Sequence, residues 1–137
     1  MKVRKIVELK SLFSFEAPIL AAEGLNANST MLSQMFDLNS VLAPKPNDVY
    51  LVRVTGESMI NEGIFDGDIL VVNKNDKPKD GKVVIAALNG EMAVKTYREI
   101  EGKVYLFSAN DKFLPIEILP FWQFDIQGVV KHVIHNV

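Results

Sequence analysis

The pattern of hydrophobic and polar positions changes near Asp48. From there to the end, short apolar runs rich in Val, Ile, Tyr and Phe alternate with turn residues, which is typical of β-strands. Many short strands with little helix between them predict a mostly β fold, built as one compact, strongly bent sheet body. We expect the strands at residues 49–55, 68–73, 82–88, 91–98, 103–108, 116–118 and 124–135.

Turn residues support this interpretation. Asn89-Gly90 lies between two apolar runs, and this dipeptide favours the two-residue turn of a β-hairpin. Glu101-Gly102 indicates a second turn, and Asp66-Gly67-Asp68 and Asp80-Gly81 indicate tight connections.

The first 28 residues keep neither a helical nor a strand period for long. We therefore expect residues 1–28 to form an irregular arm and residues 29–137 to form the β domain. One or two short helices should join the two parts. Ser29 is a candidate N-cap for the first, and Asp37 for a second that runs to Leu42. The first helix would carry Met31, Leu32, Met35 and Phe36.

Length and composition narrow the class of protein. A chain of 137 residues with 48% hydrophobic and 23% charged residues is typical of one globular domain rather than of a disordered chain. The net charge of −2 disfavours a protein that binds nucleic acid by neutralising phosphates. The absence of cysteine excludes disulfides, thiolate zinc sites and cysteine nucleophiles.

The N-terminus has some features of a signal peptide, with Lys2, Arg4 and Lys5 ahead of Ala21-Ala22. Charged residues and Pro18 interrupt the segment between them, so no apolar core of the required length exists. No apolar stretch is long enough to span a membrane. The sequence therefore predicts a cytoplasmic protein that does not contact the membrane.

The best candidate for a catalytic site is the segment Gly56, Glu57 and Ser58, at the end of a predicted strand. A serine there can present its hydroxyl, and glycine lets nearby N–H groups turn inward, as a nucleophile with an oxyanion hole requires. An ordinary turn explains the same residues. The two histidines, His132 and His135, lie in the last predicted strand on opposite faces, which favours neither a catalytic base nor a shared metal site.

Lys95 is the alternative base, because it interrupts an apolar hairpin strand between Ala93 and Tyr97. An exposed strand lysine is the ordinary case. A lysine held against the core instead has a lowered pKa, and its neutral amine can accept a proton from a serine hydroxyl.

These residues resemble a known family. The stretches YLVRVTGESMINEGIFDGDILVV, KVVIAALNGEMAVKTY, FSAND, PIEI and FDIQGVVKHVIH look like the self-cleaving Ser-Lys peptidase domain of the LexA/UmuD type, over residues 37–135. The resemblance implies the bent β body of that peptidase domain, with Ser58 as nucleophile and Lys95 as general base. It also implies an oxyanion hole made by the backbone N–H groups of Glu57 and Ser58, with no metal and no cofactor.

Within the family the short arm resembles UmuD-type members more than repressors, which carry a helical DNA-binding domain before the peptidase body. The resemblance then implies an SOS mutagenesis role in the DNA-damage response. A RecA–single-stranded DNA filament would stimulate removal of the arm, and the trimmed homodimer would join an error-prone Y-family polymerase subunit for translesion synthesis. A sliding clamp is a further candidate partner, and no direct sequence-specific DNA binding is expected.

The cleavage site departs from the family pattern, which is a small residue followed by glycine. Cutting between Glu23 and Gly24 places a carboxylate in a pocket for a small side chain, and cutting between Ala22 and Glu23 loses the glycine. A non-cleaving accessory subunit of a DNA polymerase, or a truncated phage-type repressor or antirepressor, therefore stays an alternative.

Other candidates have ordinary explanations. Asp66 and Asp68 fit a turn as well as a metal pair, and Asp80-Gly81-Lys82 lacks the remaining residues of a phosphate-binding loop. The aromatic segment 121–124 fits either core packing or a partner surface.

Overall fold

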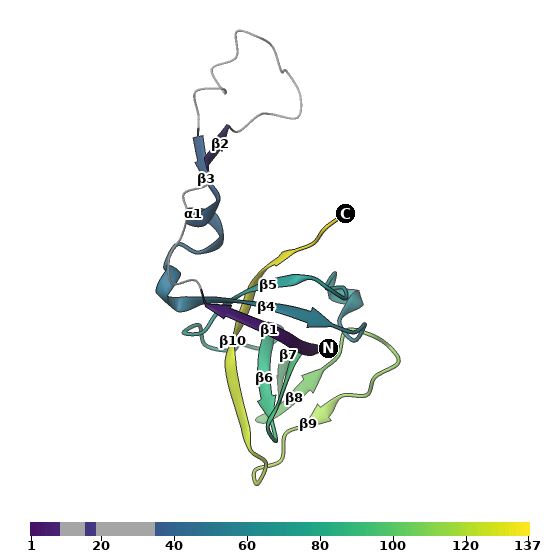
Figure 1. Ribbon diagram of the computed structural model, residues 1–137. Coiled ribbons are helices and arrows are strands. Elements are labelled where there is room, and N and C mark those ends of the chain that lie inside the picture. Colours follow the sequence, from purple (N-terminus) through teal and green to yellow (C-terminus); the bar gives the residue numbers. More distant parts are fainter. Residues whose placement is uncertain (9–15, 19–34) are drawn as a thin grey trace.

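The computed structural model describes residues 1–8, 16–18 and 35–137 (Figure 1). Within these residues an eight-stranded antiparallel sheet has the order β1-β4-β5-β10-β6-β7-β8-β9. Its strands are β1 (Lys2–Glu8), β4 (Val49–Thr55), β5 (Ile69–Asn73), β6 (Val83–Leu88), β7 (Glu91–Ile100), β8 (Lys103–Phe107), β9 (Ile116–Glu117) and β10 (Phe124–Ile134). The expected mostly β class and the seven expected strands are confirmed, with ends shifted by no more than a few residues.

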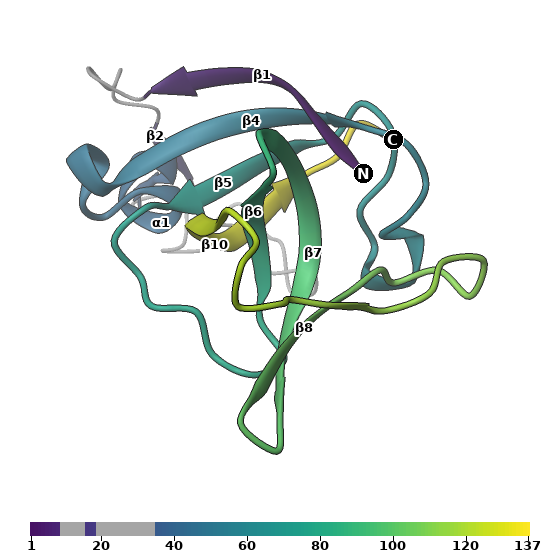
Figure 2. The same cartoon turned by 90° about the horizontal axis from the view of Figure 1, so that it is seen from below.

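The long strand β10 bends the sheet. Its first half pairs with β6 and its second half with β5, and irregularities in the ladder lie at Ile126/Gly128 and Val130/His132. Such bulges increase local twist and let one strand serve two differently oriented parts of a sheet. In Figure 2, β7 and β8 accordingly run across the direction of β4 and β5.

The bend encloses the main hydrophobic core, which has ten buried members. These are Met1, Tyr50, Val52, Val54, Met59, Ile64, Leu70, Val72, Ile85 and Val94. Side chains on one strand alternate between faces, so the intervening positions of β6 and β7 reach a second cluster: Val84, Ala86, Tyr97, Leu106 and Val129. Because Phe124 packs against this second cluster while Phe121 is 80% exposed, the aromatic segment divides between core and surface.

The hairpin turns have the backbone that their sequences predict. Asn89 and Gly90 both have positive φ and connect β6 to β7, and Glu101 and Gly102 do the same between β7 and β8. Two successive residues with positive φ form the turn whose twist matches a β-hairpin.

The sequence missed a strand in the arm. Residues 2–8 showed no clear alternation, yet β1 pairs with β4 along its length, from Lys2 opposite Thr55 to Glu8 opposite Tyr50. Lys2 also pairs with Ala93 of β7. Backbone hydrogen bonds to two neighbouring strands compensate for the weak local pattern.

Short elements connect the arm to the body. The helix expected after Asp37 is confirmed as α1 (Leu38–Leu42), and the Asp37 side chain accepts the Asn39 N–H at 3.0 Å. The expected helix from Ser29 is wrong at its described end, where Met35 and Phe36 belong to β3 (Met35–Asp37), paired with β2 (Glu16–Pro18). Its start lies outside the described residues. Single turns of 3-10 helix, η2 (Pro46–Asp48) and η3 (Ile60–Glu62), flank β4.

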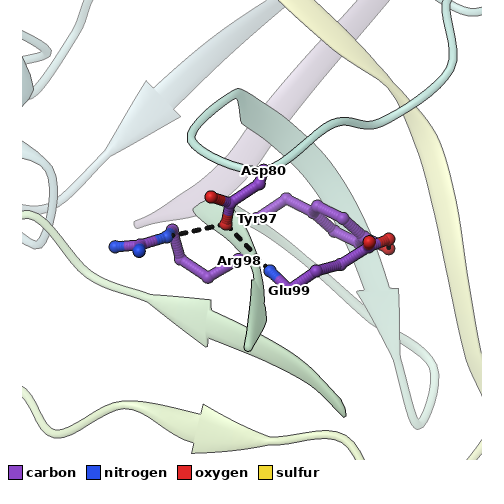
Figure 3. A network of polar contacts seen from close by, with 4 residues as sticks. All are labelled: Asp80, Tyr97, Arg98 and Glu99. Carbon is purple, nitrogen blue, oxygen red and sulfur yellow. Dashed lines mark hydrogen bonds and ion pairs between the residues drawn. The ribbon is translucent and has the colours of Figure 1, made fainter. Parts of the chain in front are cut away.

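A polar network fixes the far end of β7 (Figure 3). The Asp80 carboxylate accepts hydrogen bonds from Arg98 Nε at 2.8 Å and from the Glu99 N–H at 2.9 Å. These bonds hold the pKa of Asp80 below its ordinary value. Tyr97 donates its hydroxyl to Glu99 at 2.6 Å, and burial chiefly raises the pKa of Tyr97 to about 12. The network holds the 80–82 turn against the strand that carries Lys95.

Candidate active site

Ser58 follows β4 on a loop whose shape is set by two aspartates. The Gly56 N–H donates to Asp66 Oδ1 at 2.9 Å, and Gly56 itself has a φ of 101°, which favours glycine. The backbone closes the same loop, since Gly67 N–H donates to the Val54 carbonyl and Val54 N–H to the Asp68 carbonyl. The Asp-Gly-Asp segment therefore acts as a structural turn beside the serine.

The Asp68 side chain ties this turn to the C-terminal strand. Its carboxylate is buried and accepts the Phe65 N–H at 2.8 Å on one oxygen. Its other oxygen lies 2.5 Å from His135 Nδ1. His135 therefore has a structural partner, the carboxylate of Asp68 in this turn. Among the described residues no group of three or more His, Cys, Asp and Glu side chains could hold a metal ion.

Ser58 is 2% exposed, and Met1 lies against its hydroxyl. The Met1 α-amine donates a hydrogen bond to Ser58 Oγ, and the Met1 carbonyl accepts the Val94 N–H at 2.9 Å. Burial first, then the charges of Lys95 and Lys2, lower the pKa of this amine to about 6.

Lys95 lies on β7, and its side chain extends toward the segment that follows β8. Its Nζ donates to Ser108 Oγ at 2.6 Å and lies 5.9 Å from the centre of the Phe113 ring. Burial lowers the pKa of Lys95, as expected for an amine held against the body. Val94, the residue before Lys95, donates its N–H to the Met1 carbonyl, so Met1 contacts both β7 and Ser58.

The segment after β8 joins the two halves of the site. Asn110 Nδ2 donates to the Glu57 carbonyl at 2.9 Å, and the Asn61 N–H donates to the Ala109 carbonyl at 2.8 Å. The Ala109 N–H lies 3.3 Å from the Met59 sulfur. Residues 108–110 therefore bond both to Lys95 and to the loop around Ser58, which fixes one relative to the other.

The structure thus places Ser58 and Lys95 on two segments that residues 108–110 connect, and the catalytic roles of both stay predictions. The candidate cleavage residues Ala22, Glu23 and Gly24 lie outside the described residues. The role of the Glu57 and Ser58 N–H groups in an oxyanion hole stays a prediction.

Sequence reasoning missed three contributors: Met1, Ser108 and Asn110. Ser108 and Asn110 belong to the FSAND stretch that carried part of the family resemblance, so the sequence did contain a feature from which their place in the site could have been predicted. No local pattern indicates that Met1 lies at Ser58, because this contact joins residues 57 positions apart.

The chain is similar to known proteins in two comparisons. The family model described as Peptidase S24-like matches residues 13–131, which include Ser58, Lys95 and the 108–110 segment.

No helix in the described ranges is long and apolar enough to cross a membrane.

Several curated proteins similar to this chain are named LexA repressor. The one from Vibrio cholerae serotype O1 is 38% identical over 120 residues, covering 87% of this chain and 54% of the relative. The one from Dechloromonas aromatica is 36% identical over 121 residues, covering 88% and 56%. This chain thus spans about half the length of the curated relatives it matches. Because the family model matches most of its length, the chain belongs to the Peptidase S24-like family.

Proposed function

We propose that the protein is a self-cleaving serine peptidase in which Ser58 is the nucleophile and Lys95 the general base. The observation that carries the proposal is the contacts that link the two residues: residues 108–110 bond both to Lys95 and to the loop around the buried Ser58, and Met1 contacts both Ser58 and β7. A desolvated lysine is the kind of base that can activate a serine without histidine. Membership of the Peptidase S24-like family supports the same chemistry.

The reaction balances with these two side chains and water. Lys95 Nζ, as the neutral amine, takes the Ser58 hydroxyl proton while Oγ forms a bond to the scissile carbonyl carbon. The tetrahedral oxyanion is stabilised by the backbone N–H groups of Glu57 and Ser58. The carbon–nitrogen bond then breaks, and the leaving amine takes the proton from Lys95. Water, deprotonated by Lys95, hydrolyses the ester and restores Ser58.

The substrate in this proposal is the arm of the chain itself, cut between Ala22 and Glu23 or between Glu23 and Gly24. A tethered segment reaches a high local concentration, so it needs little binding energy of its own. Glu23 makes either bond a poor substrate for cleavage, because its carboxylate would lose its water of solvation next to the reacting carbonyl. Slow cleavage is therefore expected without a stimulating partner.

At the level of the cell we propose a UmuD-like role. A RecA–single-stranded DNA filament would stimulate loss of the arm, and the trimmed homodimer would serve an error-prone Y-family polymerase, with a sliding clamp as a further partner. The net charge of −2 supports this over direct DNA contact. The relatives named as repressors favour a second candidate, the peptidase body of a repressor-type protein.

The test is intact-mass spectrometry during mild alkaline incubation and during exposure to RecA, ATP and single-stranded DNA. Wild type should lose a fragment ending near residue 23. Ser58→Ala and Lys95→Ala should each stay full-length, with rates at least a hundredfold lower, because each removes a group that takes part in bond making. Ser40→Ala and Lys103→Ala are matched controls at exposed positions and should be cut like wild type.

Equal cleavage of the alanine variants and wild type contradicts the Ser-Lys assignment. An intact wild-type mass under both conditions supports a non-cleaving accessory subunit, for which Glu23 is the specific observation. Binding of a duplex DNA library by the full chain supports the repressor candidate.

A further inference from the structure

We propose that the first strand of the chain is an internal competitor for the site in which the arm is cut. Strand β1 (Lys2–Glu8) lies along β4 and Met1 contacts Ser58, and residues 1–8 must leave before residues 20–25 can enter. The inference rests on the proposed self-cleavage and adds to it the step that limits its rate.

The first observation that supports the proposal is the pairing of β1 with the edges of β4 and β7. One edge of β4 is paired with β5 over Val49–Arg53, and β1 covers the other edge. On β7, Ala93 pairs with Ala86 of β6 on one side and with Lys2 on the other. β8 begins to pair with β7 only at Thr96. Strand β1 therefore covers one edge of β4 along its length and reaches β7 at Ala93 and Val94, ahead of the point where β8 begins to pair.

An extended substrate needs those edges. Strand addition to an exposed sheet edge is the common way to bind an extended peptide, since the backbone supplies the hydrogen bonds. Each N–H and carbonyl on an edge accepts one added strand at a time. The arm segment and β1 are therefore alternatives.

The second observation that supports the proposal is the set of contacts that Met1 makes with Ser58 and β7. Its amine takes Ser58 Oγ as a hydrogen-bond partner, and its carbonyl takes the Val94 N–H. Its side chain, 8% exposed, joins the core cluster that contains Val54, Met59 and Val94. Figures 1 and 2 show the start of β1 at the junction of the β4 and β7 parts of the sheet.

This position blocks the chemistry as well as the binding. The hydroxyl that Lys95 would deprotonate is engaged by Met1, and Lys95 Nζ is bonded to Ser108. Release of β1 frees both the edges and the hydroxyl in one event. The apparent rate of cutting is then the intrinsic rate multiplied by the fraction of molecules with β1 released.

The test loosens β1 without touching Ser58 or Lys95. Val3 packs against the main core cluster, so Val3→Asp should unseat the strand, whereas Lys2→Arg keeps the charge at an exposed position of the same strand. In alkaline incubation Val3→Asp should be cut about tenfold faster than wild type, and Lys2→Arg within about twofold. Hydrogen exchange at the Val94 amide, which bonds to Met1, reports whether β1 is seated.

A chain with Met1 joined directly to Leu9 provides a second variant that removes the strand whatever Val3→Asp does. A synthetic peptide of residues 1–8 added to it should slow cutting again and restore protection at Val94. Faster exchange at Val94 with an unchanged or slower cutting rate overturns the inference.

Failure of the proposed function gives a different result. In that case no variant is cut, or Ser58→Ala placed in the Val3→Asp chain is cut as fast as Val3→Asp alone, while the Val94 exchange still reports the state of β1.

Discussion

At the scale of the residue, the chemistry depends on how two polar side chains are held. Ser58 is buried on the loop that Asn110 bonds through the Glu57 carbonyl, and it contacts Met1. Lys95 is half-buried, and its side-chain amine donates a hydrogen bond to Ser108. Loss of solvation disfavours the charged amine, which is why the pKa of Lys95 lies below its ordinary value.

The lowered pKa of Lys95 predicts how self-cleavage depends on pH. The active form is the neutral amine, so the rate should rise with pH and level off above the pKa. Because burial moves that pKa down from 10.5, the midpoint should lie below 10.5. The measurement is the first-order cutting rate between pH 6 and pH 11, followed by intact mass. A rate that falls with increasing pH, or a midpoint at or above 10.5, would argue against Lys95 as base.

At the scale of the element, β10 decides the shape of the body. It must cross from β6 to β5, and at the crossing Gly128 has a φ of 155°. A β-carbon built at this position would lie 2.5 Å from Val72 Cγ1 and 2.8 Å from the Asn73 carbonyl oxygen. The close approach of β10 to β5 therefore requires glycine.

Gly128→Ala should destabilise the protein by about 3 kcal/mol, because the backbone of β5 cannot easily move away from the added methyl. Gly102→Ala is the matched control: its φ is also positive, at 76°, but nothing lies within 4 Å of the added carbon. It should cost only about 1 kcal/mol of backbone strain. Urea unfolding of both variants measures the difference, and equal losses would mean that the contact with β5 carries no energy.

At the scale of the whole molecule, Met1 and His135 contact the same region from opposite ends of the fold's sequence. Met1 bonds to Ser58, and His135 bonds to Asp68 in the turn that closes the loop carrying the serine. Both contacts link residues far apart in sequence, so each depends on the packing of separate segments against this loop.

Removing the Asp68 carboxylate should therefore affect stability more than removing a surface carboxylate. Its side chain is 2% exposed and serves both the Phe65 N–H and His135. Asp68→Ala leaves these groups without their acceptor and should lower the free energy of unfolding by about 2–3 kcal/mol. Asp125→Ala, at an exposed position, should change it by less than about 0.5 kcal/mol. Similar losses in denaturant unfolding would refute the structural role of Asp68.

The β class, seven strands of the main sheet and the hairpin turns could be predicted from local patterns. Apolar runs, and turns such as Asn89-Gly90, act over a few residues, so a local pattern is enough to predict them. The residue types and a family resemblance also singled out Ser58 and Lys95 as candidates.

Long-range contacts could not be predicted in this way: that Ser108 bonds to Lys95, that residues 108–110 connect Lys95 to the loop around Ser58, and that β1 pairs with β4 and reaches β7. The arm had no period that predicted a strand, because the hydrogen bonds that stabilise β1 come from β4 and β7. The physical reason is the distance along the sequence over which each interaction acts. Strand and turn propensities depend on neighbouring residues, whereas edge pairing and burial depend on groups that only folding brings together.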